Sequence, residues 1–175
     1  RDRMGYEACL QALEHPATAM GNVGAGTGAT VGKLCGMERA SKTGIGCYAM
    51  ALGELQMAAV VVVNALGDIF DPANGTKIAG LMNEDRTAFG DSCEELWKLG
   101  CPQNLFTGNT TIGAVITNGQ FNKAQMNKIA SMTRNAYARC INPVGTMADG
   151  DSIYAASIGD VKADINVVGT LAAHV

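Results

Sequence analysis

The chain has 175 residues, enough for one domain with a sizeable core. Its net charge is −3 and its 13 lysine and arginine residues are scattered, which argues against nucleic-acid binding. The longest strongly apolar stretch, residues 57–63, is far too short to cross a bilayer, so no membrane association is expected. Apolar residues make up 47% of the chain and aromatic residues only 5%, which favours a layered α/β body of small, closely packed side chains.

The six cysteines show no Cys-x-x-Cys spacing and no neighbouring histidine, so a zinc site is not expected, nor any other metal or cofactor. In a chain this apolar they are typical of buried, reduced thiols in a cytoplasmic protein rather than of disulfides. They are Cys9, Cys35, Cys47, Cys93, Cys101 and Cys140. The chain begins Arg1-Asp2-Arg3 without an initiator methionine, which suggests a piece of a longer protein.

In the first half of the chain, residues 4–15 predict a helix that covers one face of a sheet and ends before Pro16. Residues 42–52 alternate as a strand does. The continuous apolar run 55–63 is typical of a strand covered on both faces. Residues 68–81 predict a hairpin whose turn is Asp71-Pro72-Ala73-Asn74-Gly75.

The second half predicts a short helix over residues 92–99 with Trp97 on its apolar side, then an irregular approach to a strand that follows Thr110. Residues 122–140 have apolar side chains at helical spacing and form the clearest helix. A strand follows Asp151, and a helix over residues 164–175 closes the chain.

The glycine-dense segment 21–33 invites two phosphate-loop readings. Gly24-x-Gly26-x-x-Ala29 loosely matches a dinucleotide fingerprint, but no convincing strand leads into it. A Walker loop ending at Lys33 would need glycine where Thr27 stands and a hydroxyl where Leu34 stands. What remains is a backbone that can pass close to a substrate, or a surface loop whose lysine is ordinary.

Thr110 would stand at the mouth of a buried strand, where its hydroxyl could act as a nucleophile. The chain has only two histidines, His15 and His174, so a Ser/His/Asp arrangement is hard to assemble. If the chain were cut between Asn109 and Thr110, the freed α-amine, with a reference pKa of about 8, could serve as the base. The alternative is that Asn-Thr-Thr is simply a turn that enters a strand.

Three other polar residues each allow a structural and a functional interpretation. Asn64, at the exit of a buried strand, either caps a turn or donates hydrogen bonds into a site. Asp149 and Asp151 put two carboxylates on one side of the backbone, as a solvated turn or as part of a site. A calcium loop is disfavoured because the residues that follow supply no side-chain oxygen donors at the required positions.

Several motifs in order resemble the DmpA family, whose members are L-aminopeptidase/D-esterases, β-peptidyl aminopeptidases and the nylon-oligomer hydrolase. The spacing of the Asn-Thr-Thr and Asp-Gly-Asp motifs resembles the nylon-oligomer hydrolase branch most closely. The resemblance covers nearly the whole chain. The motifs are Met4-Gly5-Tyr6, Gly24-Ala25-Gly26-Thr27-Gly28-Ala29, Gly32-Lys33, the apolar strand ending in Asn64, Asn109-Thr110-Thr111-Ile112-Gly113, Lys123-Ala124-Gln125 and Asp149-Gly150-Asp151-Ser152-Ile153-Tyr154-Ala155.

The resemblance implies an αββα four-layer sandwich like that of N-terminal-nucleophile hydrolases, with its own connectivity. Residues 1–175 would form a single, partial domain, because family members carry a further N-terminal segment with strands and part of the substrate pocket. Cleavage between Asn109 and Thr110 would divide it into residues 1–109, the end of an α part, and residues 110–175, a β part beginning at the nucleophile.

The resemblance also implies a role for each site residue. Thr110 would be the nucleophile and its amine the general base. Asn64 would donate to the oxyanion, Lys33 would assist proton transfer or hold the intermediate, and Asp149 and Asp151 would orient and charge-stabilise Thr110.

The leading hypothesis is therefore a self-processing amidohydrolase or aminopeptidase that cleaves short peptides, related amides or esters through an acyl-threonine intermediate. The alternative is an inactive or truncated family relic that acts as an assembly or binding protein. A nucleotide-binding module built on residues 24–33 is a third possibility. The low charge and large apolar fraction favour a homo-oligomer.

Overall fold

The computed structural model of the protein describes residues 2–16, 18–100 and 108–175. Its centre is a four-stranded sheet. Along this sheet the first and second strands pair antiparallel, as do the second and third, whereas the third and fourth pair parallel. In spatial order the strands are β3 (Ile45–Leu52), β4 (Leu55–Val62), β7 (Ile112–Gly119) and β9 (Ser152–Val161). Strands β3 and β4 form a hairpin, and Gly53 in its two-residue turn adopts a φ of 60° that favours glycine.

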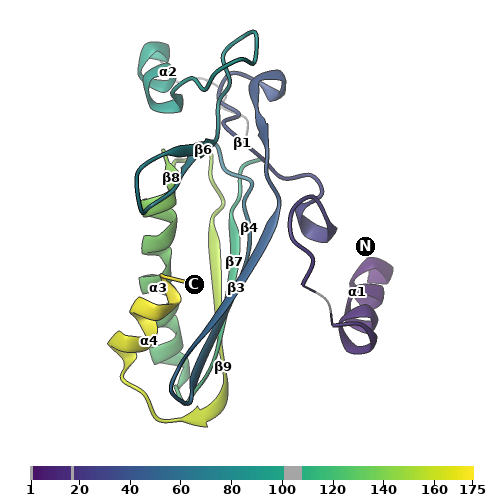
Figure 1. Ribbon diagram of the computed structural model, residues 1–175, viewed down its shortest axis with the longest axis vertical. Helices are drawn as coiled ribbons and strands as arrows, with labels where there is room; N and C mark the ends of the chain where they lie inside the picture. Colours follow the sequence, from purple (N-terminus) through teal and green to yellow (C-terminus); the bar gives the residue numbers. More distant parts are fainter. Residues whose placement is uncertain (1, 17, 101–107) are drawn as a thin grey trace.

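Two helices, α3 (Lys123–Cys140) and α4 (Ile165–Ala172), lie on one face of this sheet (Figure 1). The side chain of Asn122 accepts from the amide of Gln125 while the Gln125 side chain accepts from the amide of Asn122, so a capping box starts α3. The side chain of Asp164 caps α4 by accepting hydrogen bonds from the amides of Asn166 and Val167. The core between these helices and the sheet is apolar and comprises Leu55, Met57, Ala59, Val115, Met126, Ile129, Val168 and Ala172.

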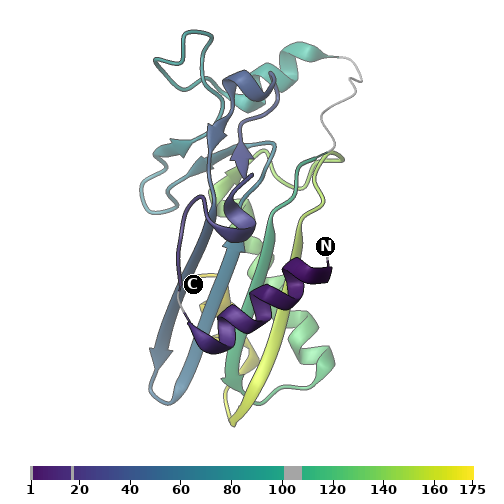
Figure 2. The ribbon, with the colours of Figure 1, turned by 90° about the vertical axis from the view of Figure 1, so that its right-hand side faces the viewer.

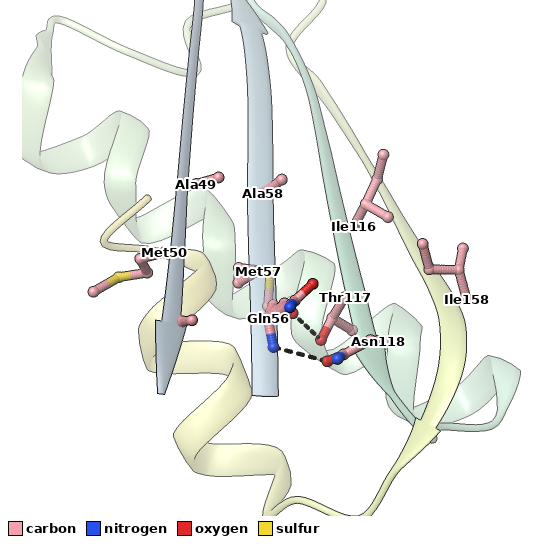
Figure 3. Close-up of a pocket in the computed structure, with 10 residues that line it drawn as sticks. Ala49, Met50, Gln56, Met57, Ala58, Ile116, Thr117, Asn118 and Ile158 are labelled. Atoms are coloured by element: carbon pink, nitrogen blue, oxygen red, sulfur yellow. Dashed lines mark hydrogen bonds between the residues drawn. The ribbon is translucent and has the colours of Figure 1, made fainter. Parts of the chain in front are cut away.

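Among the described residues, no helix packs against the opposite face of the sheet, and this face is largely apolar. Alternation along β4 sends Met57 toward the helices and Gln56 and Ala58 to the open face, where Ile116 and Ile158 also lie (Figure 3). Ile158 is 74% exposed. The expectation that residues 55–63 form a strand covered on both faces is therefore wrong for the described residues: from Met57 onward the run is continuously apolar because its outward side chains are alanine and valine.

Helix α1 (Asp2–Glu14) lies on the open side of the sheet, across from α3 and α4 (Figures 1 and 2). None of its residues is buried, so the prediction that it covers a sheet face is wrong. Of the predicted αββα layers, the described residues supply one helix layer, one large sheet and this helix on the far side of the sheet.

Smaller elements gather at one end of the large sheet (Figure 1). They are the pair β1 (Thr30–Val31) and β2 (Ser41–Lys42), the sheet of β6 (Lys77–Ala79), β5 (Asp68–Phe70) and β8 (Ile141–Asn142), helix α2 (Ser92–Leu99), and the 3₁₀ turn η2 (Met37–Arg39). A second 3₁₀ turn, η1 (Gly24–Gly26), lies against β3. The hairpin predicted over residues 68–81 is confirmed as β5 and β6, and α2 has the predicted bounds. Trp97 on α2 is 74% exposed, so its apolar surface is not packed against the described residues.

The buried carboxylate of Asp68 connects several of these smaller elements. Asp68, only 1% exposed, accepts hydrogen bonds from the amides of Leu81 and Ser92 at 2.7 and 2.9 Å and from the Ser92 hydroxyl at 2.7 Å. The ammonium of Lys77 lies 2.7 Å from the Asp68 Oδ2 atom, which also accepts from the Ser92 amide. Asp68 thereby joins β5 and β6 to the start of α2.

The five cysteines among the described residues are free thiols, but none of them is buried. Cys9 is exposed and Cys35, Cys47, Cys93 and Cys140 are half-buried, whereas Cys101 lies outside the described residues. The expected burial is thus wrong for these five. No helix in the described ranges has both the length and the apolar composition that a membrane span requires.

Candidate active site

Thr110 lies at the entrance of β7, as the sequence predicts. Its amide donates to the backbone carbonyl of Asn64 at 2.8 Å, and its hydroxyl donates to the carbonyl oxygen of Asn109 at 2.5 Å. Asn109 is only 1% exposed. The irregular approach predicted before Thr110 falls largely on residues 101–107, which lie outside the described residues.

Asn64 follows the end of β4 and connects three segments around Thr110. Its side-chain amide donates to the carbonyl of Gly108 at 2.8 Å. Its side-chain oxygen accepts from the amide of Thr30 at 3.2 Å and from the ammonium of Lys33 at 2.8 Å. Because the Asn64 backbone carbonyl binds the Thr110 amide, the same residue fixes both the lysine and the threonine.

Lys33 is buried, with 4% of its surface exposed, which excludes the reading of an ordinary surface lysine. Its backbone amide donates to Leu66, and Gly32 before it has a φ of 66°. A Cβ on Gly32 would lie 1.9 Å from the amide nitrogen of Leu81, so only glycine allows the two backbones to approach this closely. The glycine therefore lets the lysine enter the interior beside Asn64.

Burial lowers the pKa of Lys33 to about 8, because the charged ammonium loses solvation; the nearby Asp149 carboxylate opposes this shift. A lysine with such a pKa exchanges its proton near neutral pH. It is suited to proton transfer in a way that a solvated lysine is not.

The two aspartates hold the backbone on either side of the site. Asp149 accepts from the amide and hydroxyl of Thr146 at 2.9 and 2.7 Å and from the amide of Leu66 at 3.4 Å. Asp151 accepts from the amide of Thr111, the residue after Thr110, at 2.8 Å. Both carboxylates are thus attached to segments that adjoin Lys33 or Thr110.

The pKa of Asp151 is raised, first by burial and then by the negative charge of Asp149, while the Thr111 amide and the charge of Arg134 act in the opposite direction. Tyr137 on α3 has a raised pKa from burial and from the Asp151 charge. Asp151, Arg134 and Tyr137 line one cavity of about 290 Å³ beside α3. Asp151 therefore borders a cavity on the side of the site that faces α3.

The structure brings together all five predicted residues, Lys33, Asn64, Thr110, Asp149 and Asp151, through the contacts above. It adds three contributions that sequence reasoning missed: the backbone amides of Thr30, Thr111 and Gly150. Backbone donors have no side-chain signature, and only the glycine inside Asp149-Gly150-Asp151 gave a signal that could have been followed.

The glycine-dense segment does not form a phosphate loop in the described residues. Gly24–Gly26 is a three-residue 3₁₀ turn, and the next element is the strand β1 rather than a helix. The ammonium of Lys33 is directed to Asn64 rather than into a loop. In the ranges that the structure describes, no group of three or more histidine, cysteine, aspartate or glutamate side chains could hold a metal ion.

Comparison with protein families gives a match to the model described as peptidase family S58 over residues 2–173. An uncharacterized aminopeptidase of Mycobacterium leprae is 33% identical over 169 residues, covering 91% of this chain and 44% of the relative. A 6-aminohexanoate-oligomer endohydrolase of Agromyces is 32% identical over 144 residues, covering 81% of this chain and 40% of that protein. The chain thus spans less than half the length of these curated relatives.

Solved structures share the fold. The L-aminopeptidase D-Ala-esterase/amidase of Ochrobactrum anthropi, described as a variant of the Ntn hydrolase fold, superimposes with a TM-score of 0.55 at 16% identity, over 89% of this chain and 40% of that one. A β-aminopeptidase of Burkholderia gives a TM-score of 0.54 at 18% identity, over 89% and 43%. The predicted fold class, α/β of the N-terminal-nucleophile type with DmpA-like connectivity, is confirmed.

Proposed function

Because the chain belongs to peptidase family S58, we propose that it is part of a self-processing hydrolase that cleaves short peptides or related amides and esters through an acyl-threonine intermediate. The aminopeptidase and amide-oligomer hydrolase among its relatives support this class of substrate. The proposed mechanism uses only side chains, backbone groups and the amine that cleavage releases.

One observation above all supports the proposal. The Thr110 hydroxyl is hydrogen-bonded to the carbonyl oxygen of the peptide bond that precedes it, at 2.5 Å, so the nucleophile and the bond to be cut are already adjacent. Lys33, whose pKa burial lowers to about 8, is joined to Thr110 through Asn64. A hydroxyl nucleophile, a proton acceptor and a target carbonyl thus lie in one connected network.

After the proposed cleavage, the α-amine of Thr110 would accept the proton of its own hydroxyl as the hydroxyl attacks a substrate carbonyl. The Asn64 amide binds the Gly108 carbonyl in the uncut chain. If cleavage after Asn109 lets the Gly108 carbonyl move away, the amide would then donate to the oxyanion of the intermediate, which is worth about 3 kcal/mol in comparable sites. Asp149 and Asp151 would keep the surrounding backbone and charge in place.

We also propose that the protein works as a cytoplasmic homo-oligomer without nucleic-acid or membrane partners. The exposed apolar face of the large sheet supports burial against further protein, because contiguous apolar surfaces of this kind are uncommon on soluble monomers.

The proposal is tested by expressing the full-length protein that contains this chain and following intact mass and N-terminal sequence. We expect a fragment that begins Thr-Thr-Ile-Gly and release of N-terminal residues from short peptides or of amine from amide oligomers. Thr110→Ala should abolish both, Thr110→Ser should retain both, and Thr170→Ala, at an exposed position on α4, should change neither.

An uncut wild-type protein without hydrolytic activity would overturn the proposal and favour the alternative, an inactive relic that serves as a binding or assembly protein. Cleavage or hydrolysis that persists in purified Thr110→Ala would show that another residue is the nucleophile.

A further inference from the structure

The carbonyl oxygen of Asn109 has a second donor besides the Thr110 hydroxyl. Residues Asn109 and Asp149 form a parallel β-bridge, and this bridge places the amide of Gly150 2.9 Å from the Asn109 oxygen. That oxygen belongs to the bond that the proposed self-cleavage breaks.

Cleavage would begin when the Thr110 hydroxyl oxygen adds to the carbonyl carbon of Asn109, its proton passing to a nearby base. Negative charge then collects on the Asn109 oxygen. The proton is delivered to the Thr110 nitrogen, the carbon–nitrogen bond breaks, and an ester joins Asn109 to the Thr110 side chain. Water hydrolyses this ester to give a carboxylate on Asn109 and a free hydroxyl and amine on Thr110.

The attacking hydroxyl cannot stabilise this oxyanion, because it loses its proton in the same step. The Asn64 side chain is also engaged, since its amide binds the Gly108 carbonyl in the uncut chain. The Gly150 amide, by contrast, keeps its proton throughout the addition and can donate to the charged Asn109 oxygen.

The backbone of Gly150 is held from both sides. On one side the Asp149 carboxylate is bound by Thr146 and Leu66. On the other side, the amide of Ser152 donates to the carbonyl of Thr111 at 3.0 Å, which starts the pairing of β9 with β7. The donor therefore needs no rearrangement to meet the charge, which is the condition under which such donors are effective.

The absence of a side chain at Gly150 also matters. A Cβ built there would lie 2.9 Å from the Thr110 hydroxyl oxygen, closer than real Cβ atoms approach other heavy atoms. Gly150 has no positive φ that would by itself require glycine. The close approach to the predicted nucleophile is the feature that favours glycine here.

We propose that Gly150 is a catalytic residue of self-cleavage: its backbone amide stabilises the oxyanion formed on Asn109, and its lack of a side chain leaves the Thr110 hydroxyl room to attack. This inference rests on the proposed function. It assigns the oxyanion donor of self-cleavage to Gly150 and leaves Asn64 as the donor for later substrate hydrolysis.

The first test is Gly150→Ala in the full-length protein, with the rate at which the fragment beginning at Thr110 appears as the readout. We expect cleavage at least tenfold slower, because the methyl group displaces the hydroxyl. Gly46→Ala is the matched control, since nothing lies within 4 Å of a Cβ at that position, and its rate should equal that of the wild type. Unfolding of the two variants in a Thr110→Ala background shows whether either substitution alters the fold.

The second test removes only the donor. A synthetic peptide that begins at Cys140 can carry an ester in place of the amide between Asp149 and Gly150 and be ligated through Cys140 to the preceding part of the chain. After refolding, we expect cleavage to slow on the order of a hundredfold relative to the all-amide ligation product. Wild-type rates in both the alanine and the ester proteins would overturn the inference while leaving self-processing intact. An all-amide protein that never cleaves would overturn the proposed function and this inference with it.

Discussion

The ammonium group of Lys33 binds both oxygens of one residue: it donates to the side-chain oxygen of Asn64 at 2.8 Å and to its backbone carbonyl at 3.1 Å. The same backbone carbonyl accepts the amide of Thr110. The protonation state of a buried lysine is thus linked, through one asparagine, to the predicted nucleophile.

Self-cleavage should depend on pH through Lys33. Burial lowers the pKa of Lys33 to about 8, so the fraction of neutral amine, which can accept a proton, grows as the pH rises through this value. We expect the cleavage rate to rise between pH 7 and 9 and then level. Lys33→Arg should be slow throughout because a guanidinium stays protonated. Lys128→Arg, on the exposed side of α3, is the control. A rate independent of pH would contradict a role for the neutral lysine.

The same shift should affect the free energy of unfolding. Unfolded lysine titrates near 10.5 and folded Lys33 near 8, so between these values the unfolded chain binds more protons and stability should increase with pH. Below about pH 8 the folded protein carries Lys33 in its charged form, so the full free-energy cost of burying this charge lowers the stability. In a Thr110→Ala background, which keeps the chain uncut, urea unfolding should show this increase, and Lys33→Met should lack it. If the free energies of unfolding of the two proteins changed with pH in parallel, the pKa of Lys33 would not be lowered in the folded protein.

Asn64→Asp should move the pH dependence of cleavage upward. A carboxylate at this position would face the Lys33 ammonium directly and favour its charged form, so a higher pH would be needed to obtain neutral lysine. Asn118→Asp introduces the same charge at the other end of β7 and should leave the midpoint unchanged. Equal midpoints in the Asn64 variant and the wild type would show that Lys33 does not set the profile.

Asp68→Asn should destabilise the protein by about 3 kcal/mol, because it removes the counter-charge of Lys77 and places amide hydrogens against the donors of Leu81 and Ser92. Urea unfolding in the uncut background measures this loss. Glu95→Gln disrupts the exposed ion pair with Lys98 on α2 and should leave the unfolding midpoint unchanged. A similar effect of both substitutions would contradict a structural role for the buried carboxylate.

The sequence predicted helices well where apolar spacing and capping residues within the helix itself define its position. The helix over residues 92–99 has the predicted bounds, and Asn122, predicted as the first residue of its helix, is the cap of α3. The apolar run of β4 was misjudged because a continuous stretch of valine and alanine does not show which side is covered. The burial of Lys33 could not be predicted either, because it results from contacts of Gly32 with Leu81, nearly fifty residues away in sequence.

Strand β4 lies before the proposed cleavage point and strand β7 after it, yet the two are paired from Met57 to Val62 in the centre of one sheet. Cutting the bond before Thr110 would therefore turn one polypeptide into two that share a single core. Unfolding would then release two molecules instead of one, and the cut protein would become more resistant to denaturant as its concentration increased. Refolding from the separated fragments would be a second-order reaction, whereas the uncut chain folds at a rate independent of dilution.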